Sequence, residues 1–325
     1  MWRRGNWLNL IVMGKVQVHI PVLLTEVVTS FEELNNGVFV DATLGMGGHT
    51  REILEKIPNS SIIGIDLDSE AVMLARQNLL DFGNRVNIAQ GNYVDMIQIA
   101  RNFNELNVDG VLLDLGLSSV QIDDTKRGFS FRYDSELDMR FDKTKGISAS
   151  DVLNSLDEAE LADMFYTYGE ERQSRIIAKS IVKSRPIKTT YELTEIISNI
   201  KRKSKSKINP STKVFQALRI YVNQELKNVE KGLEEAMKLL KFGGKVSVIS
   251  YHSLEDRIVK NFLRKNSIDC ICPVSMIECQ CNHTATIKIV NKKVIKPTEE
   301  EIKNNPRSRS AKLRIAQRIP LAEIV

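Results

Sequence analysis

The sequence lacks any apolar run close to the roughly 20 residues that a membrane-spanning helix needs, so we expect no membrane span. Cysteine is scarce: the chain has four, all between residues 270 and 281, which leaves the remainder without a disulfide framework. Internal repeats are absent, and the only low-complexity segment is a lysine-rich run. Together these absences predict a cytoplasmic protein.

The size and composition indicate a soluble globular chain. With 325 residues, 42% apolar and 27% charged, it is long enough for two domains or for one core with a large insertion. A mainly disordered chain, a collagen and a coiled-coil rod are excluded. The apolar stretch in residues 1–13 is too short for a signal peptide and is interrupted by Asn9, so we interpret residues 1–17 as an N-terminal extension.

Positive charge is concentrated in two places. Five cations lie within the seven residues 201–207, and a second basic zone, at 303–318, contains no acidic residue. Two such clusters in one chain favour a polyanionic partner, namely nucleic acid. The alternative for each cluster is an ordinary solvated surface.

Short apolar runs alternate with helical patterns along much of the chain. We expect strands at 37–44, 61–66, 86–90, 110–114 and 245–251, and a helix at 68–80 capped by Asp68 or Ser69. This alternation predicts an α/β fold with a doubly wound parallel sheet. Residues 285–290 and 311–318 have the pattern of antiparallel edge strands, and Thr298 and Glu301 have capping-box spacing for a helix between them.

The gap of about 130 residues between the fourth and fifth strands is far longer than one crossover requires. Its pattern predicts helices at 157–168, 170–183, 190–200 and 211–240. We therefore expect a helical insertion at 125–220, suited to RNA recognition, inside a discontinuous cofactor-binding domain formed by 18–124 and 221–325.

A glycine-rich turn follows the first predicted strand of the sheet. Gly45, Gly47 and Gly48 permit a tight turn at the start of a helix, whose free N–H groups favour a negatively charged ligand group. Asp66 ends the next strand, 18 residues after Gly48, where a carboxylate can accept hydrogen bonds from ribose hydroxyls. This combination predicts a nucleoside cofactor; a plain turn with a solvent-exposed Asp66 is the alternative.

The head of that turn is acidic, which bears on the choice of cofactor. Asp41 precedes Gly45, and a carboxylate there would repel the diphosphate of NAD but attract a cationic sulfonium with an amino-acid tail. S-adenosylmethionine is therefore favoured over NAD. An NAD-dependent oxidoreductase and a non-catalytic RNA-binding module remain the competing functions, because a fold does not determine a function.

Ten runs of sequence resemble those of the bacterial small-subunit rRNA cytosine-N4 methyltransferases, the RsmH/MraW family. They occur in order from about residue 18 to 319: HIPVLLTE (19–26), the turn at 41–50, GIDLD (64–68), DLGLSSVQIDD (114–124), RGFSF (127–131) with LDMR (137–140), YGEER (168–172), FQALRIYVNQE (215–225), SYHSLEDR (250–257) and NPRSRSAKLR (305–314).

The resemblance implies a Rossmann-like class I methyltransferase fold and an enzyme that methylates the N4 amine of one cytidine in the decoding region of small-subunit (16S) rRNA. It also implies S-adenosylmethionine as the cofactor and small-subunit rRNA as the partner, within an assembled or late-assembling 30S subunit; naked rRNA is the alternative substrate. The cofactor contacts that it implies are Gly47, Gly48, His49, Asp66, Tyr93, Asp114 and Gln121.

Asp114 is also the candidate catalytic residue. Amino-directed methyltransferases often place an Asp/Asn-Pro-Pro-aromatic tetrad after the fourth strand, whereas residues 114–117 here read DLGL. We expect Asp114 to reach both the cofactor and the target amine, with 118–119 and 251–253 forming the wall of the pocket; a structural cap at the strand end is the alternative. His252 is either a packing or a catalytic residue, and His49 either a ligand contact or a solvent-facing helix residue.

Three further features allow two interpretations each. The acidic residues between 123 and 142 alternate with arginines, which favours an ion-pair network over a metal site. The rings of Phe129, Phe131 and Tyr133 are expected either to stack on an unpaired RNA base or to pack in the core of the protein. The C-x-C pairs at 270–272 and 279–281, with His283 nearby, are spaced more closely than common zinc ligands, so we expect reduced thiols and no metal.

Overall fold

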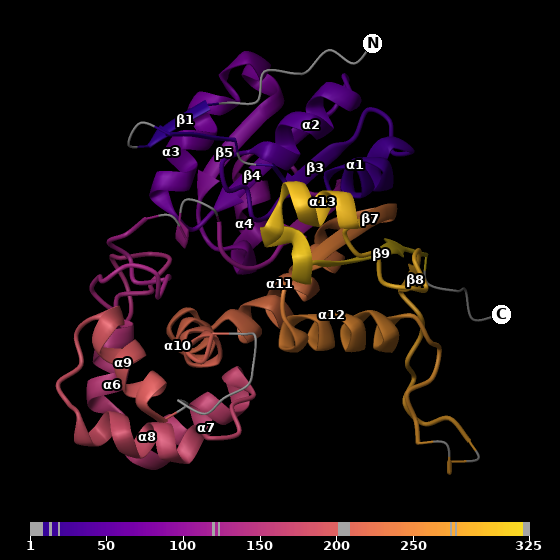
Figure 1. Cartoon of the computed structure of the whole chain (residues 1–325). Coiled ribbons are helices and arrows are strands. Elements are labelled where there is room, and N and C mark those ends of the chain that lie inside the picture. Colours follow the sequence, from indigo (N-terminus) through magenta and orange to yellow (C-terminus); the bar gives the residue numbers. More distant parts are fainter. Residues whose placement is uncertain are drawn as a thin grey trace. The chain divides into compact units, whose positions relative to one another are not determined.

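The computed structural model of the chain describes residues 9–12, 15–18, 20–118, 121–122, 124–200, 209–273, 275–276 and 278–320. The chain divides into two compact units. The first unit comprises Met1–Gly116 and Asn228–Val325, and the second comprises Leu117–Lys227. The second unit contains residues 125–220, where the sequence predicts an insertion, and extends beyond them at both ends (Figure 1). The lysine-rich run 201–207 and most of the N-terminal extension lie outside the described residues.

A seven-stranded sheet organises the first unit, with the strand order β5-β4-β3-β6-β7-β9-β8. Neighbours among the first five strands are parallel, whereas β9 is antiparallel to both β7 and β8. The strands are β3 (Val38–Asp41), β4 (Ser61–Asp66), β5 (Val86–Gln90), β6 (Val108–Asp114), β7 (Leu240–Ser250), β8 (Ile287–Ile289) and β9 (Lys312–Arg318). The doubly wound parallel sheet is confirmed. The prediction that 311–318 is an edge strand is wrong, because β9 lies between β7 and β8.

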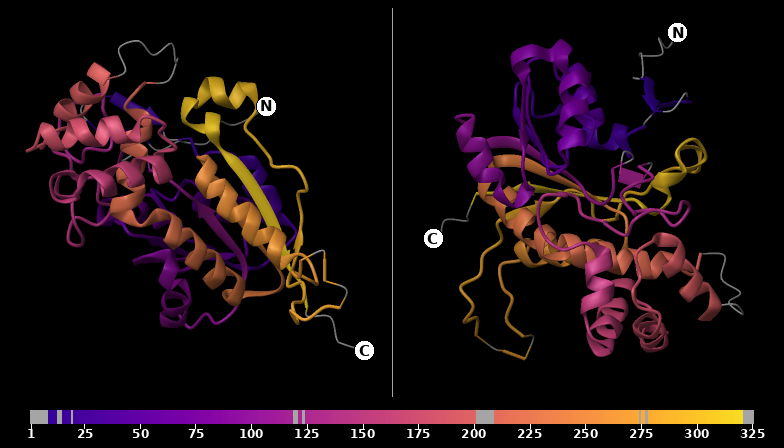
Figure 2. Two further views of the ribbon diagram at one scale, coloured as in Figure 1. Left: turned by 90° about the horizontal axis from the view of Figure 1, so that it is seen from below. Right: turned by 90° about the vertical axis from the view of Figure 1, so that its left-hand side faces the viewer.

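Both faces of the sheet are apolar because both are covered by helices. Along β6, Val111 and Leu113 pack into one core cluster while Leu112 between them packs into another, as the alternation of side chains along a strand requires. Helices α4, α11 and α12 contribute to the first cluster and α1 and α2 to the second (Figures 1 and 2). Their bounds are α1 (Leu24–Glu32), α2 (Gly48–Lys56), α4 (Met96–Asn102), α11 (Glu225–Leu239) and α12 (Ser253–Asn266).

Smaller elements complete the first unit. Asp68 caps α3 by accepting the N–H of Glu70, which confirms one of the two caps considered. The other elements are β1 (Asn9–Val12), β2 (Lys15–Val18), α3 (Ser69–Asn78), η1 (Leu80–Arg85), η2 (Tyr93–Asp95), α13 (Glu299–Asn304) and η3 (Pro306–Ser310). Among the described helices, none combines the length and apolar character that crossing a membrane would demand.

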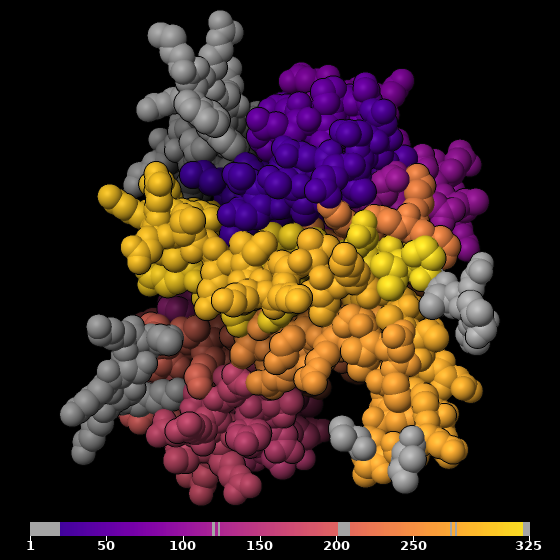
Figure 3. All heavy atoms as spheres, turned by 90° about the vertical axis from the view of Figure 1, so that its right-hand side faces the viewer, coloured from indigo at the N-terminus to yellow at the C-terminus, as the bar shows by residue number. Residues whose placement is uncertain are grey.

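Helix α13 and the residue that follows it contact the segment before α1, from the opposite part of the sequence. Thr298 caps this helix as predicted, but Glu301 does not complete the capping box, since its Oε1 accepts the N–H of Leu23 at 2.8 Å. Asn305 donates from Nδ2 to the carbonyl of Ile20, also at 2.8 Å. The space-filling view shows this C-terminal segment (yellow) against the N-terminal residues (indigo) (Figure 3). The residues that precede the glycine turn are therefore held from the far end of the chain.

The second unit is helical and has a core of its own, which includes Leu153, Phe165, Ile181 and Leu218. Its helices are α6 (Ala149–Ser155), α7 (Glu158–Gly169), α8 (Ser174–Lys183), α9 (Thr190–Ile200) and α10 (Thr212–Asn223). The single helix predicted at 211–240 is wrong: Gln224 has φ +50° and separates α10 from α11. An amphipathic pattern continues across such a break because it reports burial and not backbone continuity. Helix α6 was missed.

Candidate functional site

Four neighbouring parallel strands end at one edge of the sheet, in the order β4, β3, β6 and β7. Asp66, Asp41 and Asp114 are the last residues of the first three strands, and Ser250 is the last of β7. The chain runs outward from β3 to β5 and then returns to β6 on the other side of β3, which makes this edge a topological switch point. In open α/β sheets, ligands bind at such a point beyond the carboxyl ends of the strands.

The glycine turn lies against Asp66. The N–H of Gly45 donates to Asp66 Oδ2 at 2.8 Å, and the N–H of Asp68 donates to Asp66 Oδ1 at 2.9 Å. Gly45 has φ +53°, and no atom lies within 4 Å of the position that a Cβ would take there. The turn is thus tied to the end of β4, with open space above Gly45.

Neighbouring side chains leave no room for a Cβ atom at Gly47 or Gly48. Gly47 has φ +83°, donates its N–H to the carbonyl of Leu44, and has Leu79 on the side where a Cβ would point. A Cβ on Gly48 would lie 2.5 Å from Pro21. What these residues can offer a ligand is backbone at the start of α2, where first-turn N–H groups have no partner within the helix.

We expect Gly47→Ala to lower the free energy of unfolding by about 2–4 kcal/mol, because a left-handed backbone and crowding against Leu79 both oppose a methyl group. Gly45→Ala is the matched control: its φ is also positive but its Cβ has open space, so about 1–2 kcal/mol is expected. Chemical denaturation measures both. Equal losses in the two variants would contradict this account of the turn.

Asp41, whose charge carried the sequence argument for a cationic ligand, faces inward. Its side chain is only 2% exposed; Oδ2 accepts the hydroxyl of Thr50 at 2.7 Å and Oδ1 the N–H of Thr43 at 3.4 Å. Burial raises its pKa above the ordinary value. The acids that remain partly accessible are Asp66 and Asp114, so these two, and not Asp41, are the groups that could attract a cation.

Asp114 is surrounded by three groups of the first unit. Its backbone N–H donates to Thr43 Oγ1 at 2.6 Å, the hydroxyl of Tyr251 donates to its Oδ1 at 2.8 Å, and its Oδ2 lies 3.8 Å from His49 Nδ1. Its side chain is 22% exposed. Burial raises the pKa of Asp114 to about 6, and it does the same for Asp66. Both carboxyls are therefore harder to ionise than a solvent-exposed aspartate.

His49 is buried, with 7% exposure, so the alternative of a solvent-facing ring is wrong. Its Nε2 lies 3.0 Å from the carbonyl oxygen of Val22, which can only accept; Nε2 must therefore carry a proton. That leaves Nδ1 facing Asp114 across 3.8 Å, too far for a direct hydrogen bond but close enough for an ion pair when the ring is protonated.

His252 has a structural position at the start of α12. Its Nδ1 accepts the N–H of Glu255, and Glu255 Oε2 in turn accepts the N–H groups of Tyr251 and His252, which completes a capping box. The His252 Nε2 lies 3.1 Å from Glu255 Oε1. Of the two alternatives for His252, this arrangement favours packing and capping. Glu255, which holds Tyr251 in place below Asp114, was missed from the sequence.

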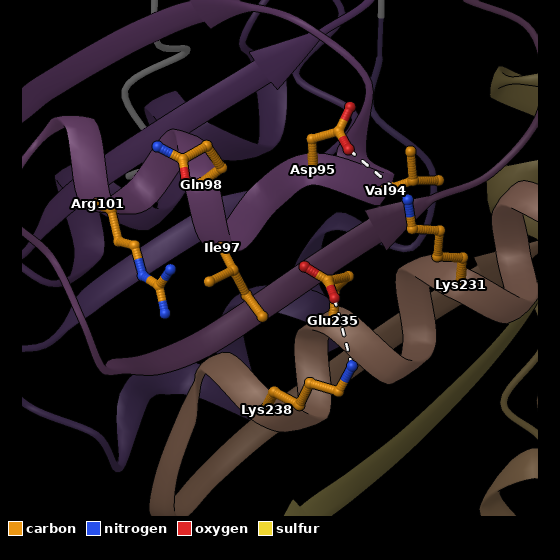
Figure 4. A pocket seen from close by; sticks show the side chains of 8 residues that line it. All are labelled: Val94, Asp95, Ile97, Gln98, Arg101, Lys231, Glu235 and Lys238. Atoms are coloured by element: carbon orange, nitrogen blue, oxygen red, sulfur yellow. Dashed lines mark hydrogen bonds and ion pairs between the residues drawn. The ribbon is translucent and has the colours of Figure 1, made fainter.

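Tyr93 packs within the first unit, where its ring lies against Gly232 of α11: a Cβ on Gly232 would be 2.5 Å from the ring. Beside it, a surface cavity of about 330 Å³ opens between α4 and α11 (Figure 4). None of the predicted site residues lines this cavity, and two lysines there lie within ion-pair distance of its acids, Lys231 of Asp95 and Lys238 of Glu235.

Gln121 belongs to the second unit, unlike the other predicted site residues. Its side-chain Oε1 accepts the N–H of Ser118 at 3.1 Å. Ser119, predicted to help wall the pocket, lies outside the described residues. The structure therefore brings together Gly47, Gly48, His49, Asp66 and Asp114, with Tyr93 in the same unit.

The aromatic and acidic residues of the second unit favour the structural alternatives. Phe129 stacks on Phe141 at 5.7 Å between centroids and Phe131 meets Phe215 edge-on at 5.4 Å, whereas Tyr133 is 52% exposed. The acidic stretch contains an Asp138–Arg140 ion pair at 2.7 Å, and no candidate metal cluster includes it within the described residues.

The basic zone at 303–318 is partly neutralised by an acidic residue from a different element of the fold. Asp256 of α12 lies 3.2 Å from Lys312 Nζ and 2.8 Å from Arg314 Nε. The guanidinium of Arg318 donates to the carbonyl of Leu240 and lies over the ring of Phe242. Lys303 and Arg309 are exposed. Only part of this zone is therefore left to face an external polyanion.

Comparison with known proteins covers nearly the whole chain. The profile of the MraW methylase family matches residues 16–319. A ribosomal RNA small subunit methyltransferase H of Dehalococcoides mccartyi is 45% identical over 302 residues, which cover 93% of this chain and 86% of the relative. The protein of the same name from Syntrophus aciditrophicus is 44% identical over 312 residues, covering 94% of this chain and 99% of the relative.

Among solved structures, a putative rRNA methylase from Clostridium thermocellum aligns with 93% of this chain and 100% of its own length, at 13% identity and a TM-score of 0.44. A likeness at that level does not bear on the assignment of individual residues.

Proposed function

This chain belongs to the MraW methylase family, and we propose that it transfers a methyl group from S-adenosylmethionine to the N4 amine of a cytidine in small-subunit (16S) rRNA. Full-length relatives named ribosomal RNA small subunit methyltransferase H support the substrate class. The observation that carries the proposal is the pair of partly exposed carboxylates, Asp66 and Asp114, at a switch point beside a glycine turn.

The residues at this edge fit the cofactor. Asp66 has one lone pair left on each oxygen after its two backbone contacts, enough to accept the two ribose hydroxyls. Gly45 leaves open space beside it, and the backbone of Gly48 and His49 begins α2, where a carboxylate group is favoured. Tyr93 would lie beside the adenine, and Asp114 would complete the part of the site that the first unit supplies. When bound, the cofactor supplies an electrophilic methyl group on a sulfonium.

Asp114 would orient the target amine. The amine of cytosine is a poor nucleophile because its lone pair is delocalised into the ring, and an acceptor on its N–H restores lone-pair character. The ionised Asp114 can accept that hydrogen bond while Tyr251 holds its other oxygen. Orientation of this kind lowers the barrier by converting an encounter into an intramolecular reaction. The reaction therefore needs Asp114 deprotonated.

The pH dependence of methyl transfer tests this role. Because burial raises the pKa of Asp114 to about 6, activity should increase as pH rises through 6. The Tyr251 hydroxyl stabilises the carboxylate, so Tyr251→Phe should raise the pKa of Asp114 and move this acid limb upward by about 1–2 pH units. The phenyl ring retains the packing against Gly116. An acid limb that stays in place would argue against Asp114 as the titrating group.

We further propose that the substrate is a small subunit at a late stage of assembly, in the cytoplasm. The exposed cations Lys303 and Arg309 would contact phosphates, and binding should weaken as salt increases. The lysine-rich run 201–207 is a second candidate contact but lies outside the described residues.

The decisive experiment offers the protein labelled S-adenosylmethionine with either naked 16S rRNA or small subunits from a strain that lacks it. We expect label at N4 of one cytidine, transferred to the assembled particle. If no methyl group is transferred to any RNA, the result would support a non-catalytic RNA-binding module instead. Thermal stabilisation by NADH but not by S-adenosylhomocysteine would instead support the oxidoreductase.

A further inference from the structure

A long loop joins α12 to β8 and carries every cysteine of the chain. Within its described residues, 267–273, 275–276 and 278–286, there is no helix or strand. Its base is closed by two hydrogen bonds, from Thr286 N–H to the carbonyl of Asn266 at 2.9 Å and from Ala285 N–H to Asp269 Oδ1 at 3.0 Å. Figures 1 and 2 show the loop extending away from β8.

Apolar burial does not hold the far part of this loop together. Ile271 is 43% exposed and Met276 is 44% exposed, and neither belongs to a core cluster. A segment of this length without a core needs another cross-link to keep one conformation, which in small units is commonly a disulfide or a metal. The cysteines are the groups available for either.

The four sulfur atoms gather at one point. All of them lie within 4.8 Å of one another, with Cys279 Sγ 3.6 Å from Cys281 Sγ and Cys281 Sγ 3.9 Å from Cys270 Sγ. Four thiolates at a Zn–S distance of about 2.3 Å in a tetrahedron have sulfur atoms about 3.8 Å apart. These two separations lie on either side of that value, and both are far longer than the ~2.05 Å bond of a disulfide.

Backbone groups of the loop point at the same sulfurs. The N–H of Ile271 donates to Cys281 Sγ at 3.4 Å, and the N–H of Gln280 donates to Cys272 Sγ at 3.5 Å. Each bond runs from one C-x-C pair to a sulfur of the other, so the two pairs face each other across the loop. Hydrogen bonds to ligand sulfur orient it and stabilise its ionised form.

We propose that this loop binds one structural Zn²⁺ ion through its four cysteines, Cys270, Cys272, Cys279 and Cys281. Thiolate ligands in a tetrahedron select zinc or an iron–sulfur cluster, and zinc requires no further inorganic component. The close C-x-C spacing, which favoured free thiols in the sequence, is not an obstacle, because each pair supplies two corners and the fold of the loop brings the pairs together.

His283 does not belong to this ligand set. Within the described residues the cluster contains the four sulfurs alone, and His283 Nε2 lies 2.8 Å from the carbonyl oxygen of Lys265, at the base of the loop. The imidazole thus ties the loop to the end of α12. His283→Ala is therefore a matched control that alters the same loop without removing a ligand.

The test is the metal content of the full chain, expressed without a histidine tag in zinc-containing medium. Elemental analysis should find about one zinc per chain, and less than about a tenth of that after Cys272→Ser with Cys279→Ser. His283→Ala should retain the zinc. Replacement by Co²⁺ should give the visible absorption of a tetrahedral thiolate complex, which Cys270→Ser alone should alter.

Several results would overturn the zinc assignment. They are a metal-free protein with four reactive thiols, two disulfides detected by mass spectrometry, iron with acid-labile sulfide, or zinc retained by the double variant. Binding of S-adenosylhomocysteine, measured on the same samples, should be equal in the wild type and the double variant. The zinc site and the proposed methyl transfer can therefore fail independently of each other.

Discussion

Asp114→Asn is expected to reduce methyl transfer by about 10²–10⁴-fold, the range seen when a positioned proton acceptor is lost. Asparagine keeps the shape of the side chain, and its oxygen can still accept the hydroxyl of Tyr251. It cannot supply an ionised acceptor to the amine. Initial rates with labelled S-adenosylmethionine at pH 8 measure the loss, because Asp114, with a pKa of about 6, is ionised there in the wild type.

The same substitution is expected to stabilise the fold, which separates a catalytic role from a structural one. A carboxyl whose pKa is raised by folding contributes stability below its unfolded-state pKa of about 4, and that contribution is lost as pH rises through about 6. Asp114→Asn removes the buried charge, so it should increase the free energy of unfolding at pH 8 by about 1–3 kcal/mol and have less effect near pH 5.

A control for this prediction lies at the other end of the same strand. Asp109 of β6 accepts the N–H of Val38 at 2.8 Å and pairs with Lys241 at 2.9 Å. Asp109→Asn should therefore affect stability but leave methyl transfer unchanged. If the Asp114→Asn enzyme methylates at the wild-type rate, Asp114 has no role in the reaction. If the variant loses stability along with activity, Asp114 acts as a structural cap at the end of the strand.

Asp66→Ala is expected to weaken binding of S-adenosylhomocysteine by about 100-fold. Two hydrogen bonds from ribose hydroxyls to a charged acceptor would be lost, at about 1.5–3 kcal/mol each before the remaining contacts adjust. The same change also frees the N–H of Gly45, so the turn loses its tie to β4. Isothermal calorimetry measures the affinity. The KM for the cofactor should rise far more than kcat falls.

Asp68→Ala is the matched control, two residues further along. Its carboxylate accepts the N–H of Glu70 at 3.0 Å and caps α3, so its loss should cost about 1 kcal/mol of stability and little cofactor affinity. Equal losses of affinity in the two variants would mean that the loop as a whole, and not the Asp66 carboxylate, holds the nucleoside.

Much of the sheet could be predicted because its signals are local. Short apolar runs identified the parallel strands, and the positions of Asp66 and Asp114 at strand ends followed from where those runs stop. The insertion was predicted from the excess length of the segment and its helical pattern. The break at Gln224 was not, since the residues on both sides keep a buried face and a left-handed residue other than glycine has little sequence signature.

The contacts that define the site could not be predicted from local sequence patterns. Tyr251 meets Asp114 across 137 positions of sequence, and Asp256 meets Arg314 across 58. Each pairing exists because β7 lies beside β6 on one side and β9 on the other. The burial of Asp41 has the same origin, since the turn and α2 cover it.

From the sequence alone came the fold class, the family resemblance and the residues at the strand ends, because periodicity and strand termini are encoded by neighbouring residues. Only the tertiary structure established which acids are accessible, which histidine is buried, and that the four cysteines converge. Those properties depend on the distances between segments far apart in the chain, and such distances are determined by the packing of the whole unit.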